Sequence, residues 1–172
     1  GVITIRFDAF YDCTRLTSVV IPDSTKTIGI EAFWGCTSLA SATIPDSVTD
    51  IGASAFVLCT SLASVTIPSR VTKIWPSTFA ECSSLPTVTI PDRVTNISMT
   101  AFYNCRSLRA VTIGSGVTFV YSDAFYACSD LLGVYFEGNA PSLYPAGFYA
   151  GTNATVYYLP GTSGWGPTLG GT

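Results

Sequence analysis

Residues 36–58 read CTSLASATIPDSVTDIGASAFVL, and close copies of this stretch follow one another along most of the chain. The period is 23 residues, as marked by six cysteines at Cys13, Cys36, Cys59, Cys82, Cys105 and Cys128. A fixed period of this length is typical of one supersecondary unit stacked many times, because a single unit cannot bury its apolar face alone. The sequence therefore predicts a solenoid with one continuous core.

Each repeat contains a short stretch of alternating apolar and polar residues that ends at a proline. In the quoted repeat Ala42 and Ile44 alternate with Ser41 and Thr43, and Pro45 follows. Alternation of this kind is typical of a half-buried strand, and proline stops a strand because it has no N–H for the ladder. We expect parallel strands over 40–44 and its equivalents, and a second short extended stretch at 48–51 and its equivalents.

Two invariant columns are predicted to lie in the core. We expect every cysteine to be a buried free thiol and the phenylalanines to form the spine of the interior, from Phe10 to Phe148. The central members of these columns are Cys36, Cys59, Cys82, Cys105, Phe33, Phe56, Phe79 and Phe102.

A helical turn is predicted in front of most of the cysteines. Ser, Thr or Asp stands before the Ala-Phe pair in several repeats, as at Ser54 and Thr100, and these residues are favoured helix N-caps. The predicted fold class is therefore a mainly β solenoid with short helical turns.

The chain divides into four parts on this pattern. Residues 1–12 form a partial repeat, 13–127 five full repeats, 128–150 a degenerate capping repeat, and 151–172 a further strand at 154–159 followed by a loose, glycine-rich tail. Because Gly1 falls in the middle of a repeat, we expect the natural protein to extend beyond it.

Composition bears on several classes of function. The net charge of −3 is too small and of the wrong sign for nucleic-acid binding, and no apolar run is long enough to span a bilayer. The chain has no histidine, the commonest general base and transition-metal ligand, and its evenly spaced cysteines lack the paired pattern of a zinc site. We expect no enzyme activity, no cofactor and no metal.

The motif C-x-x-L-x-x-V-x-I-P-x-x-V-x-x-I-x-x-x-A-F-x-x, nearly complete from Cys36, Cys59 and Cys82, resembles the BspA-like leucine-rich repeat over residues 1–150. The resemblance implies a right-handed stack of parallel strands in a secreted or surface protein, mostly bacterial, that adheres to host proteins or other cells. No catalytic residues come with it.

The outward strand positions are the predicted binding face. They hold mostly small hydroxyl side chains, which suit exposed strands and leave room for a partner. The face comprises Ser41, Thr43, Ser64, Thr66, Thr87, Thr89, Thr112 and Tyr135, and separate aromatic or basic anchors are predicted at Trp34, Trp75, Tyr103, Tyr126, Arg106 and Arg109.

The leading hypothesis is a non-catalytic extracellular binding module for a protein or a glycan. One alternative is a structural subunit that polymerises with copies of itself, since exposed strand edges and an apolar end can template further stacking. A second is ice binding by the Ser/Thr array, although only Thr87 and Thr89 form a complete T-x-T pair.

Overall fold

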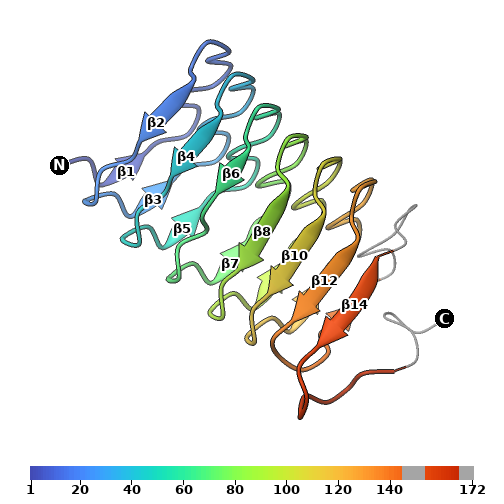
Figure 1. Cartoon of the computed structure of the whole chain (residues 1–172). Helices are drawn as coiled ribbons and strands as arrows, with labels where there is room; N and C mark the ends of the chain where they lie inside the picture. Colours follow the sequence, from blue (N-terminus) through green and yellow to red (C-terminus); the bar gives the residue numbers. More distant parts are fainter. Residues whose placement is uncertain (145–153, 167–172) are drawn as a thin grey trace.

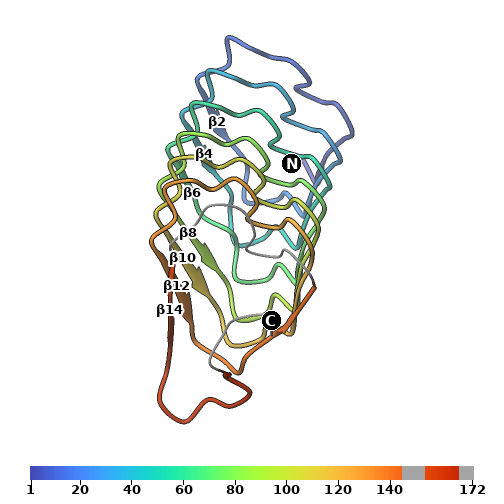
Figure 2. The same ribbon diagram turned by 90° about the vertical axis from the view of Figure 1, so that its right-hand side faces the viewer.

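The protein is a solenoid of stacked coils in a computed structural model that describes residues 1–144 and 154–166. Each coil places one strand on each of two faces and closes through a third side made of turns, so that a view along the stack shows a closed outline around one interior (Figure 2). The predicted stack of parallel strands is confirmed. Among the described residues, no helix is long and apolar enough to cross a membrane.

The longer strands form one face of the stack (Figure 1). They pair in parallel with an offset of one repeat, so that Ala110 lies opposite Gly133, and only β14 departs from it, with Gly133 opposite Thr155. These strands are β2 (Ser18–Val20), β4 (Ser41–Thr43), β6 (Ser64–Val65), β8 (Thr87–Ile90), β10 (Ala110–Ile113), β12 (Gly133–Phe136) and β14 (Thr155–Tyr158).

A second face carries two-residue strands in the same parallel arrangement. The inward residue of each strand is apolar, as the sequence predicts, and Ile28, Ile51, Ile74, Ile97 and Val120 are at most 1% exposed. The strands are β1 (Thr4–Ile5), β3 (Thr27–Ile28), β5 (Asp50–Ile51), β7 (Lys73–Ile74), β9 (Asn96–Ile97), β11 (Phe119–Val120) and β13 (Ser142–Leu143).

Both faces are interrupted near the middle of the stack. The second face splits between β5 and β7, and the first between β6 and β8. In the N-terminal part the residue after the second strand is Gly29 or Gly52, where an added Cβ would lie 2.6 Å from backbone of the preceding coil. Trp75 occupies this position after β7, so that coil cannot approach as closely, and Pro86 before β8 has no N–H to donate.

The third side of each coil is a run of turns, and the predicted helical turns are wrong. The supposed N-cap residues Ser54 and Thr100 have φ of 57° and 56°, in the left-handed region, whereas an N-cap is usually extended. Alternate N–H groups donate to the next coil, as from Phe56 to the Thr78 carbonyl at 2.9 Å. Groups used in this way cannot bond along a helix, and the described residues contain none.

The phenylalanine column forms the predicted spine of the core. Phe10, Phe33, Phe56, Phe79, Phe102 and Phe125 stack face to face with centroid spacings of 5.0 to 5.4 Å, and all except Phe10 are fully buried. The stack crosses the sheet interruption without a break. The last member predicted from the sequence, Phe148, lies outside the described residues.

Five of the six cysteines are buried free thiols, as predicted. Each of the five donates its S–H to a phenylalanine carbonyl of the preceding coil at 3.1 to 3.3 Å, as from Cys82 to Phe56. Cys13 is the exception and is exposed, because no coil in the described part of the chain covers it. The prediction that all six are buried is therefore wrong at Cys13.

The C-terminal coil is covered as far as residue 166. The predicted strand at 154–159 is observed as β14, and Trp165 stacks on Tyr158 at 4.7 Å and packs against Phe136. The backbone N–H of Ala140 donates to the Ser163 carbonyl at 2.9 Å. The prediction that the tail is loose from 161 onward is therefore wrong up to residue 166, and residues 145–153 and 167–172 lie outside the description.

Candidate binding site

The outward side chains of the longer strands form one polar surface, here called the sheet face. Ser41, Ser64 and Thr87 line up along the stack in one column, and Thr43, Thr66 and Thr89 in a second; all six are exposed, and Thr112 is half-buried. Their inward neighbours Ala42 and Val88 are at most 4% exposed. The structure therefore brings the predicted face together, since alternate residues of a strand point to opposite sides.

The C-terminal end of the sheet face is aromatic. Tyr135 and Tyr157, on the paired strands β12 and β14, stack at 4.8 Å with their rings 8° from parallel, and both are exposed. The Tyr135 ring lies over Gly133, where an added Cβ would be 2.9 Å from the ring. Sequence reasoning named Tyr135 but missed Tyr157, because β14 is offset by 22 residues and stands outside the repeat register.

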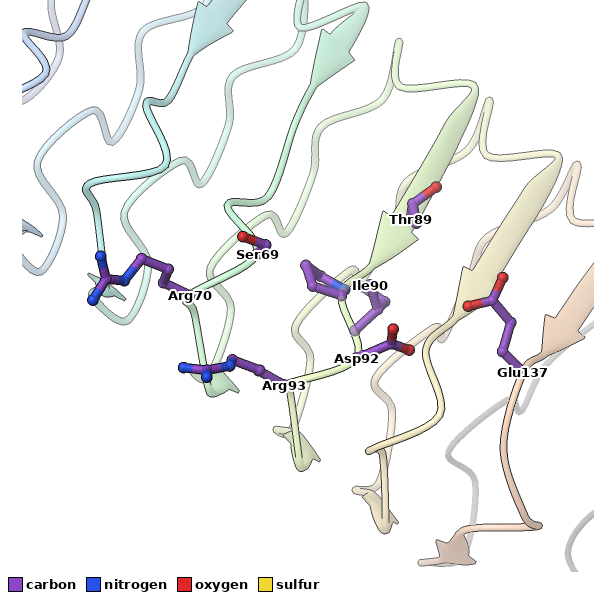
Figure 3. Close-up of a pocket in the computed structure, with 8 residues that line it drawn as sticks. Ser69, Arg70, Thr89, Ile90, Asp92, Arg93 and Glu137 are labelled. Carbon is purple, nitrogen blue, oxygen red and sulfur yellow. The ribbon is translucent and has the colours of Figure 1, made fainter.

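A charged hollow of about 600 Å³, here called the edge hollow, lies beside the sheet face where the strands end. Thr89 of the sheet face is part of its lining, and Figure 3 shows Arg70 and Arg93 extending from neighbouring coils, away from the carboxylates of Asp92 and Glu137. Within residues 1–144 and 154–166, neither arginine forms an ion pair. Both guanidinium groups are exposed and available for a carboxylate or another anion.

The floor of the edge hollow is held rigid by the turn that follows β10. The Ser115 N–H and hydroxyl both donate to the Asp92 carboxylate, at 2.8 and 2.9 Å, and these bonds lower the pKa of Asp92 below its ordinary value. Gly114 and Gly116 flank Ser115, and an added Cβ at Gly116 would overlap the Asp92 carbonyl. Glycine at these two places removes the side chains that fill the same turns in other coils.

The predicted anchors do not gather at the sheet face. Trp34, Tyr103 and Tyr126 lie on the turn side of the coils, next to the phenylalanine column. Trp75 is already engaged within the chain, since its Nε1–H donates to Asp50 at 2.8 Å and the Lys73 ammonium lies 4.1 Å from its ring centroid.

The two basic anchors are also apart from the polar columns. The Nε–H of Arg106 donates to the Asn104 side chain at 2.9 Å, and Arg109 is exposed just before β10. Two other arginines, Arg70 and Arg93, border the sheet face and were missed. Their signal in the sequence was a repeated basic residue two positions after the turn proline.

The buried thiols are not placed for chemistry. Burial raises the pKa of Cys36 to about 11 and that of Cys59 to about 12, so both remain protonated in the neutral range, and a thiol is a weaker nucleophile than a thiolate. Among the residues that the structure describes, no group of His, Cys, Asp and Glu could hold a metal ion. The surfaces described above suit binding.

The comparisons with known proteins agree with this architecture. The family model for the BspA type leucine rich repeat region matches residues 3–132 in six copies. No curated protein matches the chain.

Three solved structures are similar to this chain. A leucine-rich repeat protein of T. pallidum is 34% identical, with a TM-score of 0.74 over 78% of this chain and 66% of its own. A leucine-rich cell surface protein of Faecalibacterium prausnitzii is 36% identical, with a TM-score of 0.69 over 72% of this chain and 33% of its own. The pneumococcal vaccine antigen PcpA shares the fold alone, at 19% identity and a TM-score of 0.77 over 85% of this chain and 37% of its own.

This chain spans only 66% and 33% of the length of the first two of these proteins. The repeat spelling, the stacked parallel strands and the family match over 3–132 all agree. The chain belongs to the BspA-type leucine-rich repeat family.

Proposed function

We propose that this protein is a non-catalytic binding module of the cell surface or the secreted fraction, and that the sheet face contacts an extracellular protein or glycan. The similarity to a leucine-rich cell surface protein supports the location. The observation that carries the proposal is the continuous sheet face, which runs from Ser41 to the stacked rings of Tyr135 and Tyr157.

The chemistry of the sheet face favours association with a large partner. Serine and threonine have short side chains that lose little rotamer freedom on contact, so a partner can lie close to the strands at low entropic cost. Tyrosine and arginine are the residues that most often dominate binding energy at protein interfaces. Tyr135 and Tyr157 on the face, and Arg70 and Arg93 at its edge, supply both kinds.

Arrays of purified extracellular proteins and glycans, probed with the whole chain, test the proposal. For any bound array member, the pair Tyr135→Ser and Tyr157→Ser should weaken binding by at least tenfold, as expected for loss of a centre worth about 2 kcal/mol. The pair Arg70→Ala and Arg93→Ala should weaken it less and make it less sensitive to salt. Met99→Ser, an exposed change on the turn side, is the matched control. Binding that survives both pairs would contradict the proposal.

The alternative of a polymerising subunit draws on the first coil. A hollow of about 390 Å³ there is lined mostly by apolar residues, including Val2, Ile5, Phe10 and Val19, and Val20 beside it is 87% exposed. Such a surface could receive another coil. Sedimentation velocity of the purified chain decides the matter, since concentration-dependent growth that Val20→Asp abolishes is expected only for end-to-end stacking.

A further inference from the structure

We infer that the turn side of the stack carries a separate site for a neutral pyranose ring, in a gap of the aromatic column that follows the phenylalanines. The column comprises Tyr11, Trp34, Val57, Ala80, Tyr103 and Tyr126. Its aromatic members stack in two pairs, Tyr11 on Trp34 at 4.6 Å and Tyr103 on Tyr126 at 5.7 Å, with rings within 6° of parallel. Val57 and Ala80 stand where two further rings would continue the stack.

The gap is a hollow with an aromatic ring at each end. It has a volume of about 260 Å³ and is lined by Trp34, Val57, Ala80 and Tyr103 together with polar residues. Trp34 and Tyr103 are three coils apart, roughly 14 Å at the usual strand spacing of about 4.8 Å. Each ring has one face covered by its stacking partner, so the other face is turned toward the gap.

The size of the hollow suits a single ring. It falls just below the range of about 300 to 1,000 Å³ found for drug-sized ligands. A ring seated over Ala80 would take the level that the aromatic column leaves empty and would lie against Tyr103. The electron-rich face of tyrosine attracts the weakly positive C–H groups on the apolar face of a sugar.

The polar lining distinguishes a sugar from an aromatic side chain of a protein partner. Ser54, Ser77, Thr100 and Glu81 surround the gap, and the Ser77 and Thr100 hydroxyls lie 2.8 Å apart in a hydrogen bond. Hydroxyl and carboxylate groups match the many hydroxyls of a pyranose. The lining contains no Lys or Arg, and Glu81 would repel an anion, so the inferred ligand is a neutral sugar rather than a sulfated or acidic one.

This inference concerns a different side of the molecule from the sheet face and does not depend on the proposed function. The test is proton NMR titration with methyl α-mannoside, methyl β-glucoside and methyl β-galactoside. We expect at least one glycoside to bind with a Kd of about 1 mM, with upfield shifts of its ring protons from stacking. Sorbitol, which carries hydroxyls but no ring, should not bind.

Four variants locate the site. Tyr103→Leu and Glu81→Gln should each weaken binding at least tenfold and five-fold respectively, as single changes to a stacking ring and to a hydrogen-bonding group. Ala80→Tyr should abolish binding by completing the column, and its thermal midpoint shows whether it folds. Tyr121→Leu removes an equivalent ring stacked on Tyr144 elsewhere and should leave binding unchanged.

Three outcomes would overturn the inference. They are the absence of binding by every glycoside, binding that survives both Tyr103→Leu and Glu81→Gln, and preferential binding of N-acetyltyrosinamide, which would assign the gap to a peptide side chain. Loss of glycoside binding in the Tyr135→Ser and Tyr157→Ser variant, with Tyr103→Leu unaffected, would move the sugar site to the sheet face.

Discussion

The first coil and the fourth carry similar residues at equivalent positions and differ in burial. Phe79, Cys82, Leu85 and Val88 are at most 3% exposed. Their counterparts Phe10, Leu16 and Val19 are only half-buried, and Cys13 is exposed. Phe79 is stacked between Phe56 and Phe102, whereas Phe10 has a ring on one side only among the described residues. Burial in a solenoid therefore depends on the neighbouring coil as much as on the residue, which is why stability in such folds comes from interfaces.

The largest contrast is expected at the phenylalanine column. Phe79→Ala should lower the free energy of unfolding by about 3 to 5 kcal/mol, since it removes a ring with packed faces on both sides and leaves a cavity. Phe10→Ala should cost less than half as much. Denaturant melts of the two variants measure this difference, and equal losses would show that the first coil is packed as tightly as the fourth.

Alkaline pH should weaken the inner coils through their thiols. In the unfolded chain a thiol titrates near about 8.5, whereas in the fold burial raises the pKa of Cys36 to about 11 and that of Cys59 to about 12. The unfolded state therefore binds fewer protons than the native state between these values. The thiol contribution to stability is complete below about pH 8.5 and is lost as pH rises toward 11 and 12.

Unfolding measured from pH 8 to pH 10.5 checks this sign. Cys59→Ala should show a shallower decline than the parent, whereas Cys13→Ala, at the exposed position, should decline as the parent does. A stability that rises with pH over this range would contradict the assignment.

A smaller effect is expected where coils approach most closely. Gly52→Ala should destabilise the protein by about 1 to 3 kcal/mol, because the new Cβ would meet the Ile30 backbone N at 2.6 Å and force the coils apart. Ser98→Ala is the matched control in the same column, since that coil already accommodates a Cβ, and it should cost little. Thermal midpoints of both variants make the comparison; a neutral Gly52→Ala would show that the N-terminal coils can separate freely.

A stabilising change is expected in the turns. Leu58 has φ of 61°, in the left-handed region, at a position held by Asp12, Gly35 and Asn104 in other coils. Leu58→Asn should raise stability by up to about 1 kcal/mol, because asparagine tolerates this conformation and leucine does not. Leu58→Val, with a β-branched side chain, should lower stability. A melting point below that of the parent for the asparagine variant would rule out backbone strain at this turn.

The smallest effect on the fold comes from thiol labelling, which separates the two coils directly. Ellman's reagent should modify Cys13 in the native protein and leave the five buried thiols unmodified, with six reacting in denaturant. The native protein modified at Cys13 should keep its melting point within about 0.5 kcal/mol of stability, as for a surface change. Reaction of more than one thiol without denaturant would show that the inner coils open readily.

Most of the repeat could be predicted from the sequence because each feature involved a period. The strands at Ser41–Thr43 and Thr87–Ile90 and the phenylalanine stack follow from columns that recur at a fixed spacing. The turns were misjudged, since Ser54 and Thr100 have the composition of helix caps while their neighbours' N–H groups are used between coils. The exposed state of Cys13 could not be read from its column, because exposure depends on what lies beyond it.

The candidate sites were predicted less completely, since they depend on departures from the repeat. The columns of the sheet face were found, but Tyr157 and the pair Arg70 and Arg93 were not, because their positions become adjacent to Tyr135 and Thr89 only after stacking. The gap at Val57 and Ala80 is visible in the sequence only once the aromatic column has been aligned.

The constant offset between paired strands has a consequence for the length of the molecule. Every ladder from β1 to β13 joins residues one repeat apart, so removing or inserting one whole unit in this region joins equivalent points of the path and leaves the remaining contacts in register. Loss of a single residue would instead turn the inward side chains of a strand outward. The reach of the molecule can thus change in discrete increments, one coil at a time, while its cross-section stays the same.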